Sequence, residues 1–413
     1  MAIRNLIMLF ALSIMVGCGP LRPRNPPPER AESQVEIPGM PGVRAWGDEF
    51  SPIFQKDLIE SIRQEQRSGL FQEGGTVDIL AISGGGGDGA FGAGLLCGWS
   101  ASGNRPNFKL VTGISTGALT APFAFLGPAY DEKLKKVYTT ISSADILKFK
   151  SYFGMLQSEA MARNDPLAKL TTQYVDEQML KDVAAEHAEG RRLYIGTTAL
   201  DAQRPVIWNM GAIAASGHPE TLNLFRWVMI ASAAVPVAFP PVYLAVEAGG
   251  RRYDEMHVDG GVTNQVFLYG PMLKPLAAVK EMGFDQPRRH GRVFVLRNSR
   301  IKPALQTIRP IMRSIAPRAV STLIKAQGIG DLYRIYATAQ RDGAEFFLAY
   351  IPDEMDTNRT DEFDNHVMNV LFETGYKFAR RGYRWQKQPP GFTLQPDVSE
   401  PPLPIRLRTL STP

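Results

Sequence analysis

Apolar and small residues recur along the chain in a pattern that predicts successive strand–helix units. The apolar run at residues 77–82 predicts a buried strand, and the small and apolar residues 90–99 predict a helix after it. A second apolar strand over residues 108–111 precedes another buried helix over residues 115–126. Two such units in succession predict a parallel sheet, whose ligands bind at the carboxyl ends of the strands.

The same pattern continues on both sides of these units. Ser51 followed by Pro52 is typical of a helix start, so residues 53–67 predict an amphipathic helix leading into the first strand. Further helices are expected at 131–140, as a pair over 166–187, and at 224–234. Strands are expected at 193–198, 206–208, 292–297 and 346–351, with a hairpin at 243–246 and 253–258. Apart from the strand at 346–351, the chain after residue 297 up to about residue 384 is expected to be mainly helical.

The turn after the second strand has the form Gly-x-Ser-x-Gly, with Ser115 between Gly113 and Gly117. The two glycines permit a sharp turn that lifts a serine off the end of a strand, with a helix beginning behind it. A hydroxyl at a helix N-terminus is well placed for acyl transfer, because the positive end of the dipole favours a developing anion. The alternative is that Ser115 only caps the helix.

The turn after the first strand is a glycine loop made of Gly84, Gly85, Gly86, Gly87, Asp88 and Gly89. Consecutive glycines allow backbone N–H groups to converge on an anion, as an acyl-transfer oxyanion requires. The loop also matches the spacing Gly-x-Gly-x-x-Gly of dinucleotide-binding sites. That alternative requires an acidic residue at the end of the next strand, which here ends in Thr112 and Gly113, so nucleotide binding is disfavoured.

A serine nucleophile also needs a base. Asp259 ends an apolar strand and is followed by Gly260 and Gly261, which favours a carboxylate presented at the carboxyl edge of the sheet. An aspartate before glycine is also common in simple turns. The histidine alternatives are His257, which shares a strand face with Asp259, and His290 or His366 further along the chain.

Together these residues resemble the patatin-like phospholipases. The resemblance rests on SGGGGDGAF at 83–91, GISTG at 113–117 and DGG at 259–261, with GTTALD at 196–201, ASAAVP at 231–236 and FPP at 239–241. It covers roughly residues 77–297. It implies a three-layer α/β/α fold around a mostly parallel central sheet.

The same resemblance implies a Ser–Asp dyad without a catalytic histidine, with Ser115 as nucleophile and Asp259 as general base. The N–H groups around Gly85, Gly86 and Gly87 would form the oxyanion hole. The implied reaction is hydrolysis of acyl esters of phospholipids or other lipids, with no metal or cofactor.

The chain departs from the family at Asp88, where members usually carry Arg or Lys. A negative charge near the oxyanion opposes its formation and disfavours an anionic lipid head group. Asp88 therefore motivates a second hypothesis, in which the protein is a non-catalytic lipoprotein that binds or scaffolds at the membrane.

The start of the chain predicts export. Arg4 is followed by an apolar run at residues 6–16 that is too short to span a bilayer and is typical of a secretory signal. The run ends in Met15-Val16-Gly17-Cys18, which resembles a bacterial lipobox and implies a lipidated Cys18. Gly19 after it resembles lipoproteins sorted to the outer membrane, so we expect an anchored protein facing the periplasm. A plain signal peptide with an incidental cysteine is the alternative.

Composition narrows the remaining possibilities. The 413 residues carry a net charge of only +5, which does not favour a nucleic-acid partner. The second cysteine, Cys97, lies in an apolar helix pattern and is expected to be a buried inert thiol, and the five histidines show no metal-ligand spacing. We expect a signal peptide at 1–17, a lipidated cysteine and proline-rich tether at 18–45, a hydrolase domain at 46–385 and a proline-rich tail at 386–413.

Overall fold

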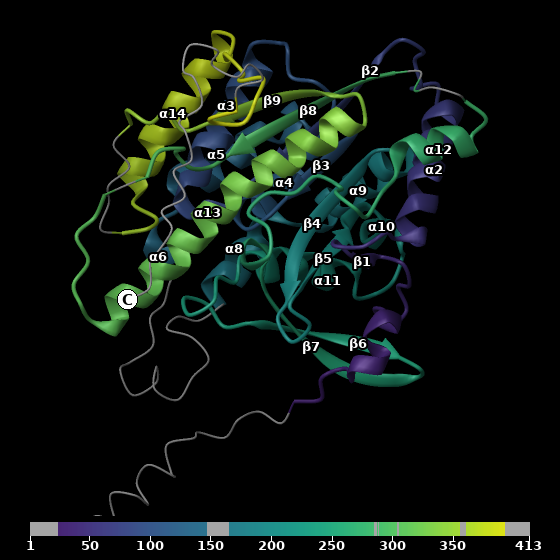
Figure 1. The fold of residues 1–413 in the computed structure, drawn as a ribbon, viewed down its shortest axis with the longest axis horizontal. Coiled ribbons are helices and arrows are strands. Elements are labelled where there is room, and N and C mark those ends of the chain that lie inside the picture. The colour runs from purple at the N-terminus through teal and green to yellow at the C-terminus, as the bar shows by residue number, and fades with distance from the viewer. Residues whose placement is uncertain are drawn as a thin grey trace, which may run out of the picture.

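A nine-stranded sheet with helices on both faces forms the centre of the computed structural model (Figure 1). The structure describes residues 24–146, 165–284, 287, 289–303, 305–355 and 361–392. The predicted signal peptide and Cys18 therefore lie outside the described residues. Within them, no helix is long and apolar enough to cross a membrane.

The strands are β1 (Arg44–Trp46), β2 (Thr76–Ile82), β3 (Leu110–Gly113), β4 (Arg192–Ala199), β5 (Arg204–Asn209), β6 (Val242–Ala248), β7 (Arg251–Asp259), β8 (His290–Arg297) and β9 (Glu345–Tyr350). The α-helices are α2 (Pro52–Arg67), α3 (Gly89–Ala101), α4 (Thr116–Leu126), α5 (Asp131–Thr140), α6 (Ser143–Ile146), α8 (Asp165–Tyr174), α9 (Glu177–Ala188), α10 (Met210–Ala215), α11 (Thr221–Ser232), α12 (Pro275–Glu281), α13 (Met312–Arg341) and α14 (Asn365–Arg380). Short 3₁₀ turns are η1 (Glu29–Gln34), η2 (Gly86–Asp88), η3 (Pro128–Tyr130) and η4 (Gly260–Val262).

The sheet is parallel at its centre and antiparallel at one side. Its strand order is β1-β5-β4-β3-β2-β8-β9, and neighbours from β4 to β9 run parallel. Strand β5 pairs antiparallel with β4, and β1 pairs antiparallel with β5. The hairpin of β6 and β7 pairs with β4 through β7. The predicted α/β class with a mostly parallel central sheet is confirmed.

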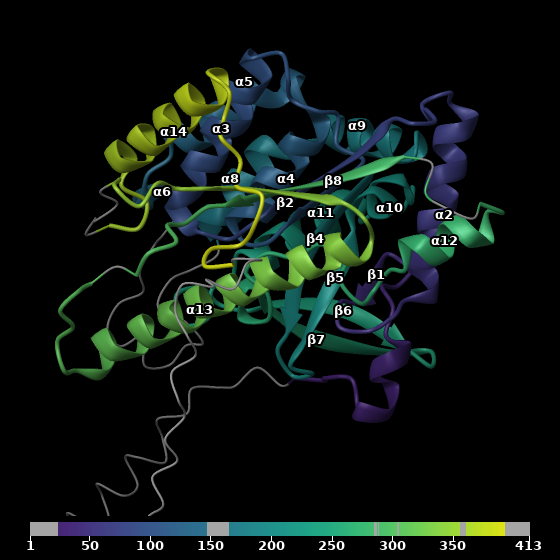
Figure 2. The same cartoon turned by 45° about the horizontal axis from the view of Figure 1, so that its top comes forward.

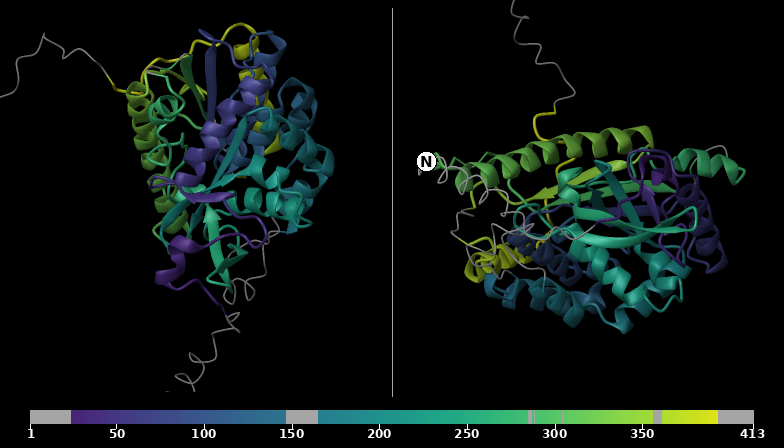
Figure 3. Two further views of the ribbon diagram at one scale, coloured as in Figure 1. Left: turned by 90° about the vertical axis from the view of Figure 1, so that its right-hand side faces the viewer. Right: turned by 90° about the horizontal axis from the view of Figure 1, so that it is seen from below.

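Each face of the sheet has its own hydrophobic core, because side chains of a strand alternate between faces. On β2, Leu80 and Ile82 point into a core shared with α3, α4, α5, α9, α11 and α14. Ile79 and Ala81 point into the opposite core, which α2 and α13 cover. The view from below shows helices above and below the sheet, so the architecture has three layers (Figure 3).

Helices α3 and α14 approach each other unusually closely within the first layer. A Cβ at Gly94 or Gly98 of α3 would overlap backbone carbonyls of α14, and one at Gly375 of α14 would overlap the carbonyl of Phe91. These glycines therefore allow α14 to pack directly against α3, the helix that follows the glycine loop. Figure 1 shows the two helices side by side although they are far apart in the sequence.

Most predicted elements are present, with shifted ends. The predicted cap of α2 is confirmed, since the Ser51 hydroxyl accepts a hydrogen bond from the Phe54 N–H at 3.2 Å. Strand β3 extends two residues beyond its prediction, because it pairs with both β2 and β4 as far as Gly113. The short elements β1 and α10 were not predicted.

The segment expected to be a proline-rich tether is largely packed against the domain from residue 24 onward. Val35, Ile37, Met40 and Val43 are buried in the first core, and Glu36 pairs with Glu247 of β6. The sequence around these residues is rich in proline, but it also contains spaced apolar side chains, each of which buries surface against the domain. A tether that reaches away from the domain therefore does not extend over residues 24–45.

Candidate active site

Ser115 lies on a strained turn between β3 and α4. Its backbone has φ 54° and ψ −124°, a conformation that non-glycine residues rarely adopt and that clusters at functional sites. The Ser115 N–H donates to the Ser232 hydroxyl at 3.0 Å, and the Gly117 N–H donates to the Ile114 carbonyl at 2.7 Å. The Ser115 side chain makes no capping hydrogen bond to α4. The hydroxyl is therefore not used as a helix cap.

The two glycines of this turn are required by space. A Cβ at Gly117 would overlap the carbonyls of Ile82 and Ser83 at the end of β2. A Cβ at Gly113 would overlap the Gly117 carbonyl and the start of α4. Helix α4 can thus begin directly against β2, which keeps Ser115 at the carboxyl edge of the sheet.

Asp259 reaches Ser115 because β3 and β7 share one edge of β4. Strand β3 pairs in parallel with β4 from Arg192 to Ile195, and β7 pairs antiparallel with the same strand from Thr197 to Ala199. The carboxyl ends of β3 and β7 therefore meet, one carrying Ser115 just beyond it and the other ending in Asp259. The structure brings these two predicted residues together although 143 positions separate them in the sequence.

The Asp259 carboxyl is buried, with 3% of the residue exposed. Its Oδ1 accepts a hydrogen bond from the Gly261 N–H at 2.6 Å. Burial raises the pKa of Asp259 to about 7, although the Ser115 hydroxyl and the Gly261 N–H both act to lower it. Its Oδ2 has no partner that satisfies full hydrogen-bond geometry, so this oxygen is available to accept a proton from the adjacent Ser115 hydroxyl.

The histidine alternatives are placed elsewhere. His257 is fully buried, with Nδ1 3.0 Å from the Thr197 hydroxyl and Nε2 2.7 Å from Glu255, which is itself paired with Arg44. His290 starts β8 at the opposite edge of the sheet and pairs with Glu345 at 2.7 Å. His366 lies on α14. Neither ring nitrogen of His257 is directed to Ser115, so Asp259 is the base candidate that the geometry favours.

The glycine loop lies against Ser115. A Cβ at Gly84 would stand 3.0 Å from the Ser115 Cβ and 3.7 Å from its hydroxyl oxygen. The N–H groups of Gly84 and Asp88 donate to Gln265 and Gly85 at 3.0 Å each, and that of Gly89 donates to the carbonyls of η2.

Among the described residues, the N–H groups of Gly85, Gly86 and Gly87 donate to no backbone carbonyl outside η2. They are the donors that the loop can offer to an oxyanion. Asp88 is half-buried and stands at the start of α3, where its charge is favourable to the helix dipole.

Two residues that support the site were not singled out as functional from the sequence. Ser232 at the end of α11 accepts from Ser115 and donates to the Gly196 carbonyl at 2.6 Å. Asn298, just beyond β8, donates its N–H to the Ser83 hydroxyl at 2.8 Å and its side-chain amide to the Ser83 carbonyl at 3.0 Å. The signals in the sequence are that Ser232 lies in the ASAAVP block at 231–236 and that Asn298 directly follows the apolar run of β8.

A cavity of about 70 Å³ adjoins the site. Gly86 of the loop and Thr116, next to the nucleophile, form one end of it. Its remaining walls are almost wholly apolar and come mainly from α4, α5 and α8: Leu119, Phe123, Val137, Ile141, Leu167, Leu170 and Val175. An apolar hollow beside a serine and a set of free N–H donors fits a hydrocarbon group attached to a carbonyl.

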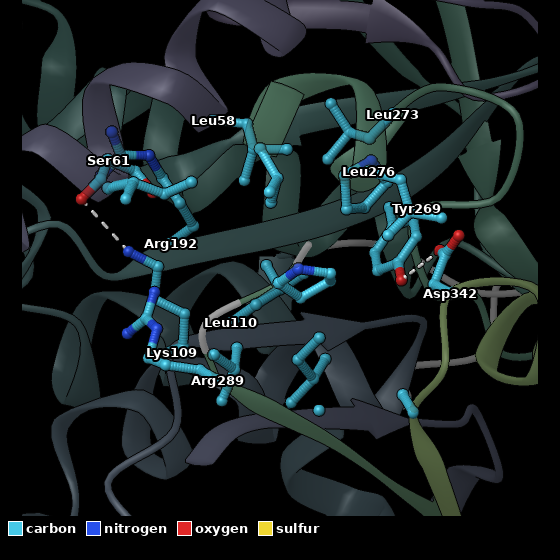
Figure 4. A pocket seen from close by; sticks show the side chains of 18 of the residues that line it. Leu58, Ser61, Lys109, Leu110, Arg192, Tyr269, Leu273, Leu276, Arg289 and Asp342 are labelled. Carbon is cyan, nitrogen blue, oxygen red and sulfur yellow. Dashed lines mark hydrogen bonds between the residues drawn. The ribbon is translucent and has the colours of Figure 1, made fainter. Parts of the chain in front are cut away.

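A larger cavity of about 170 Å³ lies at the opposite edge of the sheet (Figure 4). It is lined by residues at the amino ends of β2, β3 and β4, so it is remote from Ser115. Its cations are already paired, with Lys109 2.9 Å from Glu65 and Arg192 2.7 Å from Asp57. Burial lowers the pKa of Lys109 to about 7. We place the candidate active site at the smaller cavity.

Cys97 is buried, and its thiol lies 3.6 Å from the Asp131 carbonyl oxygen. Burial raises the pKa of this thiol to about 12, which keeps it protonated and unreactive. Across the part of the chain that is described, no cluster of three or more His, Cys, Asp or Glu residues has the arrangement of a metal site.

Comparison with known proteins gives one family. Residues 80–270 match the family described as patatin-like phospholipase. Similar solved structures include VipD from Legionella pneumophila, with 13% identity, a TM-score of 0.34 and coverage of 75% of this chain and 66% of that one. Full-length ExoU, in complex with SpcU from the type III secretion system of Pseudomonas aeruginosa, has 12% identity, a TM-score of 0.30 and coverage of 75% and 52%. This chain thus spans just under two thirds of VipD and about half of ExoU, and no curated protein matches.

Proposed function

We propose that this protein hydrolyses acyl esters of lipids with a Ser115–Asp259 dyad, because residues 80–270 match the patatin-like phospholipase family. The observation that carries the proposal is the meeting of β3 and β7 on one edge of β4, which joins a strained serine to a buried carboxyl. The free N–H donors and the apolar cavity beside them support it further.

In the acylation step, the Ser115 oxygen attacks the ester carbonyl carbon and its proton passes to Asp259. The N–H groups of Gly85, Gly86 and Gly87 bind the oxyanion that forms. The tetrahedral intermediate then collapses, the bond to the leaving alcohol breaks, and the alcohol takes the proton from Asp259. An acyl group remains on Ser115.

In the second step a water molecule attacks the acyl carbon and gives its proton to Asp259. Collapse of the second intermediate breaks the bond to Ser115, whose oxygen recovers that proton, and a carboxylic acid leaves. One carboxyl thus serves both half-reactions, and its pKa near 7 suits both roles, since it can hold and release a proton near neutral pH.

The cavity limits the acyl group that can be enclosed. A cavity of about 150 Å³ accommodates the six carbons of benzene, so by proportion one of about 70 Å³ encloses about three carbons. Short acyl chains are therefore held whole, and longer ones extend out of the cavity.

Hydrolysis of p-nitrophenyl butyrate tests the proposal. The chain beginning at Gly19 keeps every described residue, and it is compared with Ser115→Ala and Asp259→Asn, each checked for folding by circular dichroism. We expect activity in the parent protein and a loss of at least about 10³-fold in both variants. Activity retained in folded Asp259→Asn would reject the dyad. If the parent protein hydrolyses neither this ester nor phospholipids, the result would favour the hypothesis of a non-catalytic lipoprotein.

We also propose that Cys18 carries a lipid anchor and that the protein resides at the outer membrane, facing the periplasm. The support is the lipobox-like sequence that ends the apolar N-terminal run. Fractionation of cells expressing the parent chain and Cys18→Ala tests the anchor. We expect the Cys18→Ala chain, expressed with its own signal peptide, to appear in the soluble fraction. Unchanged covalent lipidation of that variant would reject Cys18 as the lipidated residue.

A further inference from the structure

Helix α13 has two halves with different surroundings. Leu332, Ile335 and Ala339 of its second half are buried in the core on one face of the sheet. At the boundary, the Gln327 side chain donates to the carbonyl of Thr263, four residues after Asp259. The first half runs on past this point, beyond the carboxyl ends of the central strands, as both cartoon views show (Figure 1, Figure 2).

The first half of α13 carries an apolar stripe that faces solvent. Met312, Ile315, Ala319, Leu323 and Ala326 follow the spacing 3, 4, 4, 3, which places them on one face of a helix with 3.6 residues per turn. Met312 is 79% exposed, Leu323 70% and Ile315 49%, and the two alanines are also exposed. Leu305, before the helix, is fully exposed at 101%. A surface helix ordinarily directs such a stripe toward the core. Because this stripe faces solvent, we infer that a partner covers it.

The same stretch of sequence has charges of one sign only. Residues 299–330 contain six lysines and arginines and no aspartate or glutamate. At 3.6 residues per turn, Arg318 and Lys325 lie along one side of the stripe, about a quarter to a third of a turn from its centre. Lys302 and Arg309 are exposed in the segment that precedes the helix.

The exposed apolar stripe and the positive charges near it together indicate which class of partner binds here. An exposed apolar stripe flanked by cations is the pattern of helices that lie in the interface of an anionic membrane. A second copy of this chain would bring two sets of positive charge together, which opposes pairing through the stripe. A nucleic acid would match the charge but leave the apolar residues exposed.

We propose that the projecting face formed by Lys302, Leu305, Arg309, Met312, Ile315 and Leu323 docks onto an anionic phospholipid surface. Its apolar side chains enter the acyl boundary and its cations bind the phosphate head groups. Because Gln327 ties α13 to the loop after Asp259, docking holds the carboxyl edge of the sheet, and with it Ser115, beside the lipid. This consequence for substrate delivery rests on the proposed function, whereas the docking does not.

The test uses the Ser115→Ala chain beginning at Gly19, so that neither turnover nor a lipid anchor contributes to binding. Sedimentation with phosphatidylcholine vesicles is compared with vesicles containing 30% phosphatidylglycerol, at low and high salt. One variant removes apolar residues of the projecting face (Met312→Ser with Leu323→Ser), and another removes its charges (Lys302→Gln with Arg309→Gln). Matched controls at other exposed positions are Leu70→Ser with Leu276→Ser, and Arg251→Gln with Lys280→Gln.

We expect binding to the anionic vesicles that weakens with salt and is at least tenfold weaker to phosphatidylcholine alone. The charge variant should bind more weakly by about fivefold per removed cation, and the apolar variant by tenfold or more, while both controls bind like the parent. The same four double variants, made with Ser115 intact, should hydrolyse soluble p-nitrophenyl butyrate equally.

Equal binding by the projecting-face variants and the controls would overturn the proposal, as would indifference to vesicle charge. A dimer in light scattering that the apolar variant converts to a monomer would also overturn it, because a second copy would then be the occupant. If the chain with Ser115 intact binds vesicles but hydrolyses neither the soluble ester nor phospholipids, the proposed function is rejected and the docking stands.

Discussion

The backbone N–H of Ser115 donates a hydrogen bond to the hydroxyl of Ser232 at 3.0 Å. That hydroxyl is fully buried and donates in turn to the Gly196 carbonyl on β4 at 2.6 Å. Ser232 therefore couples the strained serine turn to strand β4. Of the polar contacts at the Ser115 turn, this is one that a single side-chain substitution removes.

Ser232→Ala should impair both the turn and stability. The substitution leaves a buried N–H and a buried carbonyl unpaired, which costs about 1–3 kcal/mol, and it frees Ser115 to leave its strained conformation. We expect a lower melting temperature and a lower kcat for p-nitrophenyl butyrate, with KM little changed because no substrate contact is lost.

Ser61→Ala is the matched control for this variant. Ser61 is also fully buried, but its hydroxyl has no hydrogen-bond partner. Its removal should leave kcat unchanged and stability equal or higher. If Ser232→Ala behaved like Ser61→Ala, the bridge would have no part in holding the nucleophile.

The pH dependence of kcat/KM should report the ionisation of Asp259. The carboxyl must be deprotonated to accept the Ser115 proton, and burial raises its pKa to about 7. We therefore expect kcat/KM to fall about tenfold per pH unit well below pH 7 and to be level above it. His290→Asn and His366→Asn should leave the profile unchanged. A rate that stays level down to pH 5 would contradict the assignment.

Asp259→Asn should stabilise the protein at alkaline pH while it removes activity. The pKa of Asp259 is raised from 3.8 to about 7 in the folded state, so folding takes up a proton between these values. The stabilisation from that proton is present at low pH and is lost as pH rises through 7, when the buried carboxylate is charged.

Asparagine carries no charge at this position. At about 1.4 kcal/mol per pKa unit, its free energy of unfolding at pH 8 should exceed that of the parent by at most about 4 kcal/mol. Urea unfolding at several pH values measures it. The gain should shrink toward zero as the pH approaches 4. A variant that is less stable than the parent at pH 8 would show that burial does not penalise this carboxylate.

Gly84→Ala should separate catalysis from folding. The added Cβ would lie 3.0 Å from the Ser115 Cβ, so either the glycine loop or the nucleophile must shift by a few tenths of an ångström. A misplacement of this kind at a reacting group costs up to about 10²-fold in rate. We expect a folded protein whose kcat/KM for p-nitrophenyl butyrate is lower by about that factor.

Gly330→Ala provides the comparison for Gly84→Ala. A Cβ at Gly330, within α13, would meet nothing within 4 Å. We expect full activity and a gain in stability of about 0.5–1 kcal/mol, since alanine favours a helix interior. Equal activities of the two variants would show that the loop does not constrain Ser115.

The sequence predicts those elements that depend on a local pattern of apolar residues and glycines. Strand β2, the glycine loop, the serine turn and the Asp-Gly-Gly turn each follow from a periodic run that ends in glycine, and each is present. What brings Ser115 and Asp259 together is the pairing of β7 with β4 beyond the end of β3. Such a register depends on contacts between distant segments and leaves no local signature.

Two features show the limits of hydrophobic pattern. The prolines and charges around residues 35–43 predict a tether, yet Val35 and Val43 are buried. In α13 the apolar stripe from Met312 to Leu323 has an ordinary amphipathic spacing, but it faces solvent. The pattern identifies an apolar face and cannot say whether the protein or a partner covers it.

The central claim is that Ser115 is a nucleophile activated by Asp259. Its most direct measurement is reaction of the folded chain with a fluorophosphonate probe, followed by mass spectrometry of the labelled peptide. We predict a single covalent adduct on Ser115, which is absent in Ser115→Ala and forms at least about 10²-fold more slowly in Asp259→Asn. An unlabelled Ser115, or labelling at an equal rate in Asp259→Asn, would contradict the account.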